Sequence, residues 1–355
     1  MNSRPSELVN PIRRAGQAMA CMLLIGNTLP AWPHGFAGNR IFPTTFEVDD
    51  PFVMDEASFL GSYLREAGTA NVPDLIGTGV AIDYTARLPD THLGLVLGGE
   101  YRNVIPDGER TTHGFGNMLV GLKYQFFTSN RHEMIGSVGF DAAIGALGDQ
   151  SVGADSYSVL LPYIALGKGL GDLPKSLPWL KPFAITGQFG GSVATDTRLS
   201  WSQMARAGLT QRSEGVIPSK LPWGFTIQYN LNYLQYHVRD VGLDKPFSQL
   251  IPVVEFAMES CLDGPCQGQT NGTVNPGLIW FGDYFQLGAA LQIPINQRTG
   301  TDVGALALVH VFIDDLLDTH EHDHTHHHDY EGGHVEDDED HPNHDPLNLG
   351  ALFGD

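Results

Sequence analysis

Apolar and polar side chains alternate along residues 223–233, which read WGFTIQYNLNY. Successive side chains of a strand point to opposite faces, so this segment predicts a strand with one apolar and one polar face. The apolar positions are Trp223, Phe225, Ile227, Tyr229, Leu231 and Tyr233, and the polar ones are Gly224, Thr226, Gln228, Asn230 and Asn232.

The same alternation recurs along most of the chain. It is clear in 79–87, 91–102, 117–126, 181–189 and 285–296, and weaker near 134–145, 157–168, 250–259, 273–280 and 303–313. Strands of about ten residues are long enough to cross a bilayer at a tilt. A soluble β-sandwich is the alternative, but its solvent face would carry more Lys and Glu than the Gly, Thr, Gln and Asn found here. The pattern therefore predicts an all-β fold, a closed antiparallel transmembrane β-barrel of about 12 strands.

Closure follows because every backbone polar group in lipid needs a partner, so a sheet must join its own edges. Eleven strands are counted from residue 75, and bacterial barrels usually have an even number. We expect the twelfth within 36–64, around ASFLGSYLR, and expect part of the proline- and acid-rich stretch beside it to fold inward or lie below the barrel. The predicted organisation is a signal peptide at 1–31, an N-terminal segment at 32–74, the barrel at 75–314 and a disordered tail at 315–355.

The N-terminus is typical of an export signal. Arg4, Arg13 and Arg14 precede a short apolar stretch that ends near the small residue Ala31. An ordinary buried N-terminal helix is the alternative. Together with the barrel, this signal predicts the outer membrane of a Gram-negative bacterium, with membrane lipid as the first partner.

Cleavage of the signal would remove Cys21 and leave Cys261 and Cys266, in CLDGPC. Two cysteines around Asp-Gly-Pro can close a small loop in an oxidising compartment. A two-thiol metal site would need further Cys or His ligands close in sequence, and none is there. We therefore expect a disulfide.

The lengths of the connections predict the orientation of the barrel. Short turns at 88–91, 128–132 and 282–284 belong in the periplasm, and longer loops at 103–112, 146–156, 190–221 and 259–272 belong outside the cell. The connections at 168–180 and 237–248 are intermediate in length and fit less well.

Charge narrows the choice of partners. The formal net charge is −21, and residues 318–345 hold eleven Asp and Glu without Lys or Arg, which leaves −10 for the rest. An acidic chain repels nucleic acid, so this partner class is excluded. Charges on the predicted lumen face are Asp83, Glu100, Arg102, Lys123 and Asp141, each interpreted as a member of a structural ion pair before a selectivity residue.

Three stretches resemble outer-membrane barrels grouped near the phenol-degradation (meta-cleavage) pathway transporter family. They are FAGNRIFPTTFEVDDPFVMDE, PYIALGKGLGDLP and NPGLIWFGDYFQLGAALQIPIN, within a similarity that covers most of 35–314. The resemblance implies a passive channel for small, often apolar or aromatic molecules. Phe312 near the end of the last strand resembles the terminal signal read by the barrel-assembly machinery, a second expected partner.

The tail combines imidazoles with carboxylates. Its histidines are His320, His322, His324, His326, His327, His328, His334, His341 and His344. Neutral imidazole binds Zn, Cu and Ni, and at about four ligands per ion the tail could hold roughly two divalent metal ions. A solvated acidic tail without cargo is the alternative. By the even strand count the tail lies in the periplasm.

The sequence thus predicts an outer-membrane channel for small solutes, with a metal-binding tail and no required cofactor. A metal-binding or metal-sensing protein that uses the barrel as an anchor is one alternative, and an outer-membrane enzyme is another. No G-x-S-x-G, H-E-x-x-H or phosphate-binding glycine motif occurs, which favours a protein that is not an enzyme.

Overall fold

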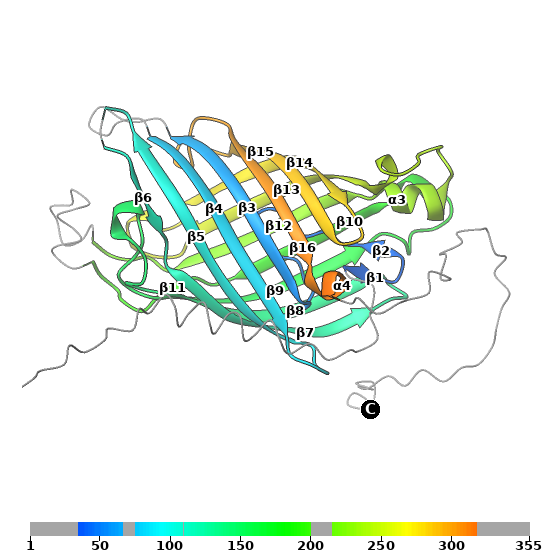
Figure 1. Ribbon diagram of the computed structural model, residues 1–355, viewed down its shortest axis with the longest axis horizontal. Helices are drawn as coiled ribbons and strands as arrows, with labels where there is room; N and C mark the ends of the chain where they lie inside the picture. Colours follow the sequence, from blue (N-terminus) through cyan, green and yellow to red (C-terminus); the bar gives the residue numbers. More distant parts are fainter. Residues whose placement is uncertain (1–34, 67–74, 109, 200–214, 318–355) are drawn as a thin grey trace, which may run out of the picture. The chain divides into compact units, whose positions relative to one another are not determined.

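Twelve antiparallel strands close into a barrel in the computed structural model, which describes residues 35–66, 75–108, 110–199 and 215–317 (Figure 1). The strands are β3 (Glu56–Glu66), β4 (Leu75–Arg87), β5 (Leu93–Pro106), β7 (Met118–Ser129), β8 (Met134–Ile144), β9 (Val159–Gly169), β10 (Phe183–Gly190), β12 (Lys220–Tyr229), β13 (Leu250–Cys261), β14 (Thr270–Phe281), β15 (Phe285–Pro294) and β16 (Gly304–Phe312). The first strand pairs with the last, from Glu56 opposite Phe312 to Tyr63 opposite Ala305. The predicted closure is confirmed, and the twelfth strand is β3, which contains ASFLGSYLR.

The outer face of the barrel is apolar. Exposed side chains alternate with inward-facing ones along each strand, as the sequence pattern predicts; they include Phe59, Val80, Ile82, Leu122, Tyr124, Phe126, Val138, Phe140, Ile185, Ile227, Leu287, Leu291 and Val309. Aromatic pairs lie on this face near the strand ends, such as Phe183 with Tyr229 at 4.7 Å between ring centroids. A surface of this kind is stable in hydrocarbon, because every strand edge is paired and the exposed groups are apolar.

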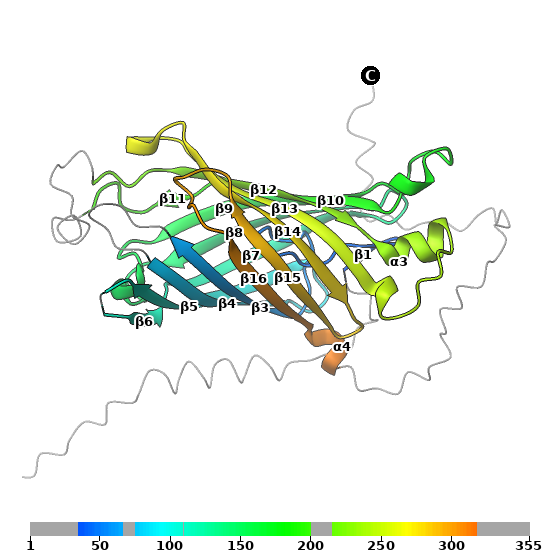
Figure 2. The same ribbon diagram turned by 90° about the horizontal axis from the view of Figure 1, so that it is seen from above.

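Residues 35–55, called here the inner segment, lie inside the barrel before β3 begins. Part of this stretch was expected to fold inward, and the structure confirms it (Figure 2). The segment starts with the short strands β1 (Phe36–Ala37) and β2 (Arg40–Ile41), which pair with each other. Its apolar side chains pack against inward-facing residues: Phe46 joins a cluster with Ile251, Val253, Ile279, Ala290, Leu306 and Leu308.

A second cluster lies nearer the start of β3, where Phe42 and Phe52 of the inner segment meet Ile135, Ala184 and Phe312. Phe312 therefore faces inward and is 1% exposed, so its ring is not presented to lipid. In both clusters, apolar side chains of the inner segment pack against apolar inward-facing residues of the strands. Barrel and inner segment share one core.

We call the end where β3 begins and β16 finishes the terminal end, and the opposite one the loop end. Turns of three to five residues join β4 to β5, β7 to β8 and β14 to β15 at the terminal end. Two longer connections lie there as well, 170–182 with η2 (Pro178–Leu180) and 230–249 with α3 (Leu231–Tyr233), η3 (Leu234–Val238) and η4 (Phe247–Gln249). These two are the exceptions to the alternation of long and short connections.

The strand predicted over 223–233 ends early, at Tyr229. The Asn230 side chain accepts a hydrogen bond from the Tyr233 backbone N–H at 2.9 Å and caps a short helix, so Leu231 and Tyr233 are helical. The helix α4 (Ile313–Leu317) follows β16. Among the described residues, no helix is long and apolar enough to cross a membrane.

Candidate functional site

The lumen is the candidate site, and one buried carboxylate contributes to holding the inner segment in it. Glu255 of β13 faces inward and is 0% exposed. Its two oxygens accept hydrogen bonds from three successive backbone N–H groups, those of Phe46, Glu47 and Val48, at 3.0, 3.0 and 3.2 Å. Hydrogen bonds to an ionised acceptor are stronger than neutral ones. Glu255 thus fixes the turn of the inner segment against β13.

The tip of the inner segment makes further contacts across the lumen. The Glu47 carboxylate accepts hydrogen bonds from Asn275 at 2.7 Å, from Thr273 at 3.0 Å and from Gln292 at 3.0 Å. Gln188 of β10 and Gln125 of β7 accept from backbone N–H groups of the segment, each at 3.2 Å. The inward-facing Gln, Asn and Thr positions, which the sequence pattern marked as one polar face, therefore satisfy the backbone of a segment without regular structure.

At the terminal end, Arg40 holds the root of the inner segment. Its guanidinium is fully buried, pairs with Glu133 at 3.0 Å and donates to the carbonyl oxygens of Pro182, at 2.8 Å, and Lys181. It also lies 3.7 Å from the ring centroid of Tyr233. Burial raises the pKa of the Tyr233 phenol to about 12, together with the negative charge of Glu133. Arg40 therefore links the inner segment to both long connections of the terminal end.

Lys123 was predicted as a lumen charge and lies on the inward face of β7. It is 2% exposed, and its ammonium group contacts Asp49 at 3.0 Å and Asp50 at 3.6 Å, both in the inner segment. The Asp50 carboxylate also accepts a hydrogen bond from the Thr44 hydroxyl at 2.7 Å. Lys123 is therefore a structural ion-pair residue, in line with the interpretation that the sequence favoured.

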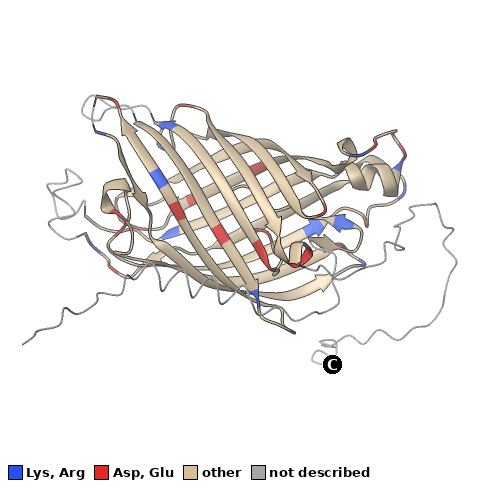
Figure 3. Cartoon of the chain, viewed as in Figure 1, with Lys and Arg blue, Asp and Glu red and all other residues tan. Residues whose placement is uncertain are grey.

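The other four predicted lumen charges also occupy inward-facing positions, on β4, β5 and β8. Figure 3 shows acidic positions on neighbouring strands of this wall. Glu100 pairs with Arg102 at 2.6 Å. Asp83 is exposed to solvent, and Asp141 is partly exposed. The structure brings Asp83, Asp141 and Lys123 around Asp49 of the inner segment, whereas Arg102 lies nearer the loop end, where it approaches Gly153.

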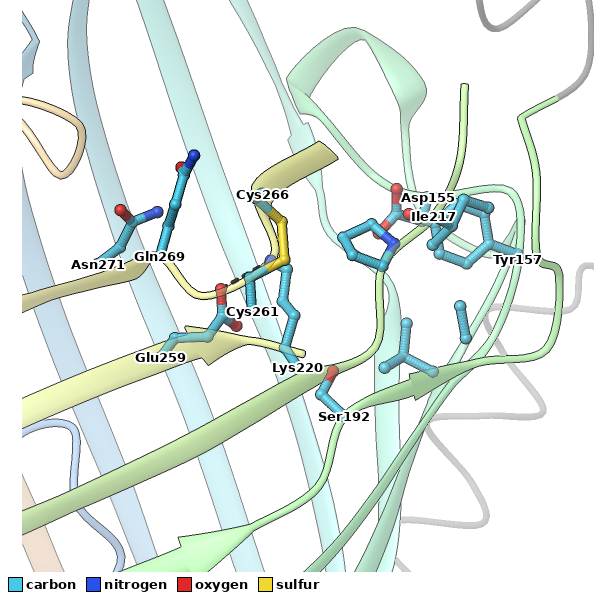
Figure 4. Close-up of a pocket in the computed structure, with 13 residues that line it drawn as sticks. Asp155, Tyr157, Ser192, Ile217, Lys220, Glu259, Cys261, Cys266, Gln269 and Asn271 are labelled. Carbon is cyan, nitrogen blue, oxygen red and sulfur yellow. Dashed lines mark ion pairs between the residues drawn. A yellow bond between two sulfur atoms is a disulfide. The ribbon is translucent and has the colours of Figure 1, made fainter. Parts of the chain in front are cut away.

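A cavity of about 460 Å³ lies at the loop end of the barrel (Figure 4). Polar lining residues include Asp155, Lys220 and Glu259, and Lys220 pairs with Glu259 at 2.7 Å. Burial raises the pKa of the Tyr157 phenol, also in the lining, to about 12, with a contribution from Asp155. We call this space the mouth cavity.

Cys261 and Cys266 are joined by a disulfide, as expected, with a Cα–Cα distance of 5.7 Å. The short helix η5 (Gly264–Cys266) lies in the loop that the bond closes. Both cysteines line the mouth cavity, so the disulfide fixes part of its wall.

The nine tail histidines lie outside the described residues, as do the predicted signal peptide and residues 318–355. Within the described part of the chain, no group of three or more His, Cys, Asp and Glu side chains is placed to hold a metal ion. His310 of β16 is buried and lies 2.8 Å from Ser58 through Nδ1.

Sequence reasoning missed Glu255, Arg40 and Asp49, the residues that hold the inner segment in the lumen. For Glu255 a signal existed: it is a single acid at an inward position of the apolar run LIPVVEFAM. A carboxylate there needs a buried partner. Arg40 and Asp49 gave no signal, because their partners are distant in sequence.

No protein-family model matches the chain, and no curated protein matches it in sequence. Solved structures similar to it include the COG4313 outer membrane channel from Pseudomonas putida F1, at 12% identity and a TM-score of 0.46, covering 77% of this chain and 99% of that one. The β domain of the Bordetella autotransporter BrkA is also similar, at 12% identity and 0.40, covering 73% and 99%. A third is LpxR from Salmonella typhimurium, at 12% identity and 0.37, covering 72% and 99%.

These likenesses concern the barrel architecture alone, and the fold itself rests on the strand pairing described above. The resemblance to the meta-cleavage-pathway family stays a prediction, since no family is identified by sequence.

Proposed function

We propose that this protein is an outer-membrane channel for small solutes, and that the inner segment closes its lumen in the state described. The observation that carries the proposal is a closed barrel with an apolar exterior and a polar interior, crossed by a segment held through side chains. The obstruction is a stretch of chain, residues 35–55, that precedes β3.

Beside the apolar clusters around Phe42, Phe46 and Phe52, the inner segment makes polar contacts of a kind that can be exchanged for water. Its turn is held by hydrogen bonds to Glu255 and to neutral amides, and its root by Arg40. A polar contact contributes little net free energy when both groups can be hydrated instead. Movement of the segment would uncover both the polar lining and the apolar inward-facing residues of β13 to β16, such as Ile251 and Leu308. The latter would suit the apolar or aromatic solutes that the family resemblance implies.

Reconstitution of the full-length protein in planar bilayers tests the proposal. We expect rare openings of the wild type and frequent openings when Glu255 is replaced by Gln. A heat-modifiability gel of boiled against unboiled samples controls for folding. Absence of any conductance in both proteins, with both folded, would refute the channel.

The tail adds a second proposed property, the binding of divalent metal ions in the periplasm. Nine histidines among carboxylates support it, as does the exit of the chain at the end where the turns are mostly short. Isothermal titration with Zn²⁺ should show about two ions per chain, lost on truncation after Leu317. If the protein is a channel, the truncated variant keeps its conductance. If it is a metal sensor anchored by the barrel, the truncated variant loses its response to metal. The same variant therefore distinguishes the two hypotheses.

A further inference from the structure

The two long connections of the terminal end expose a group of large apolar side chains, which are between 37% and 62% exposed. They are Leu177, Trp179 and Leu180 on 170–182, and Tyr236, Val241 and Phe247 on 230–249. Exposed apolar side chains are common singly, but a group of them on one part of a protein marks a contact surface. We call the two connections that carry these side chains the terminal patch.

The two connections lie next to each other beyond the ends of β10 and β12 (Figure 2). The Asn230 backbone N–H of one donates a hydrogen bond to the Pro182 carbonyl oxygen of the other, at 3.0 Å. The guanidinium of Arg239 also lies 5.9 Å from the centroid of the Trp179 ring. The terminal patch is therefore one surface, made by segments about 60 positions apart along the chain.

Both connections return to the lipid-facing surface within a few residues of their exposed apolar side chains. Leu180 lies three residues before Phe183, which packs against Tyr229 on the outer face at the start of β10, and Phe247 lies three residues before Leu250, the first residue of β13. Aromatic side chains at strand ends mark the edge of the hydrocarbon in barrels of this kind. Three residues of chain span about 10 Å at most, and the headgroup layer is roughly 5–7 Å thick on each side. Leu180 and Phe247 therefore lie in the headgroup layer or just outside it.

Unpaired cations accompany the apolar side chains. They are Lys175, Lys181, Arg239 and Lys245, and none of them lies within salt-bridge distance of an acid in the part of the chain that the structure describes. Of the three acids on the same connections, Asp172 pairs with Lys168 at 2.7 Å, whereas Asp240 and Asp244 pair with no described cation. Four unpaired cations against two unpaired acids leave an excess of positive charge on this surface, in a protein whose formal net charge is −21.

We propose that the terminal patch binds the headgroups of anionic phospholipids. Trp179, Leu180 and Phe247 insert at the edge of the hydrocarbon, and the four cations lie against lipid phosphates. Trp and Lys or Arg are the residues that favour a membrane interface, and anionic lipid attracts Lys and Arg close to the bilayer surface. The reach of the chain favours lipid over a protein partner, because it places the patch beside the membrane without a second molecule. The inference concerns how the barrel is held in its membrane, and it holds whether or not the lumen conducts.

The test is quenching of tryptophan fluorescence in vesicles of phosphatidylcholine that contain the same small fraction of dibrominated phosphatidylglycerol or dibrominated phosphatidylcholine. The signal of Trp179 is the difference between the full-length protein and its Trp179→Phe variant. We expect both brominated lipids to quench this signal, and the anionic lipid to occupy the site about fivefold more readily, the effect of one cation close to a headgroup.

Neutralising the cations should bring the ratio between the two lipids close to one while the quenching itself remains. The changes are Lys175→Gln, Lys181→Gln, Arg239→Gln and Lys245→Gln. Arg110→Gln with Arg298→Gln is the matched control, because both arginines are exposed on connections of the loop end, and its ratio should equal that of the wild type. A heat-modifiability gel verifies that each variant is folded.

Four results would overturn the proposal or one of its parts. Quenching of Trp179 by aqueous iodide but not by brominated lipid would show that the patch faces water, as a docking surface for another protein would. Equal occupancy by the two lipids in the wild type would exclude selectivity for anionic lipid. An unchanged ratio in the folded fourfold variant would exclude the four cations as its source. Quenching by lipid that begins only after truncation following Leu317 would assign the patch to the acidic tail of this chain.

Discussion

Replacement of Glu255 by Gln should free the turn of the inner segment while leaving the barrel intact. In the wild type both carboxylate oxygens are used, by the N–H groups of Phe46, Glu47 and Val48 at 3.0–3.2 Å and by Asn275 at 3.0 Å. Gln has nearly the same shape but offers only one acceptor oxygen. Its NH₂ group, which is a donor, would face a backbone N–H that the second carboxylate oxygen accepts from in the wild type.

The expected magnitude follows from these contacts. Each hydrogen bond to a charged group contributes about 1.5–3 kcal/mol, and the substitution removes the charge and at least one bond. We therefore expect the closed arrangement to lose about 3 kcal/mol, which raises the open population roughly a hundredfold. The barrel should keep its unfolding temperature, because β13 retains its pairing with β12 and β14.

Two measurements check this expectation. Hydrogen exchange of the amides of residues 46–48 should accelerate by a similar factor, and the open probability in planar bilayers should rise. Glu259→Gln is the control for the exchange readout, since Glu259 lies on the same strand and bonds to Lys220 instead. Unchanged exchange at 46–48 in a folded Glu255→Gln protein would refute the reasoning that this carboxylate holds the segment.

Three further outcomes are expected. Arg40→Ala should leave a buried carboxylate unpaired, cost about 3–5 kcal/mol and make the inner segment susceptible to proteolysis, whereas resistance equal to wild type would contradict its anchoring role. Burial raises the pKa of Asp55 to about 7, with further contributions from its hydrogen bond to Asp314 and the charge of that residue. Between about pH 4 and pH 7 the Asp55 carboxyl group is therefore protonated in the folded state and ionised in the unfolded state. The docking of α4 should therefore be most stable in acid and weaken as the pH rises through about 7, as exchange of α4 amides would show, and Asp314→Asn should flatten this dependence. Replacement of Cys261 and Cys266 by Ser should cost about 2 kcal/mol, measured by denaturant unfolding, because the closed loop is short.

The strands could be predicted from sequence because their pattern is local. Each residue of a barrel strand faces either lipid or lumen, so a period of two identifies strand, face and the inward position of Asp83, Glu100, Arg102, Lys123 and Asp141 together. Prediction failed at residues 231–233, where the alternation continued by chance beyond Tyr229. There the side chain of Asn230 capped a helix, a contact that competes with strand pairing.

The inner segment was foreseen only in outline. Its prolines and acids argued against a strand, but no local pattern names Glu255 as the partner of residues 46–48, about 207 to 209 positions away. The same holds for Arg40 with Glu133, separated by 93 positions, and for Lys123 with Asp49, separated by 74. Lys123 was recognised as inward, yet whether it faces water or a carboxylate depends on where the inner segment lies.

The sequence by itself predicted a closed barrel of strands with an apolar exterior, because side chains alternate along each strand and a sheet in lipid must pair every edge. Only the tertiary structure decided which inward-facing residues the inner segment buries and which stay exposed. That choice arises from contacts between the inner segment and strands far along the chain, and contacts of that range leave no period in a sequence.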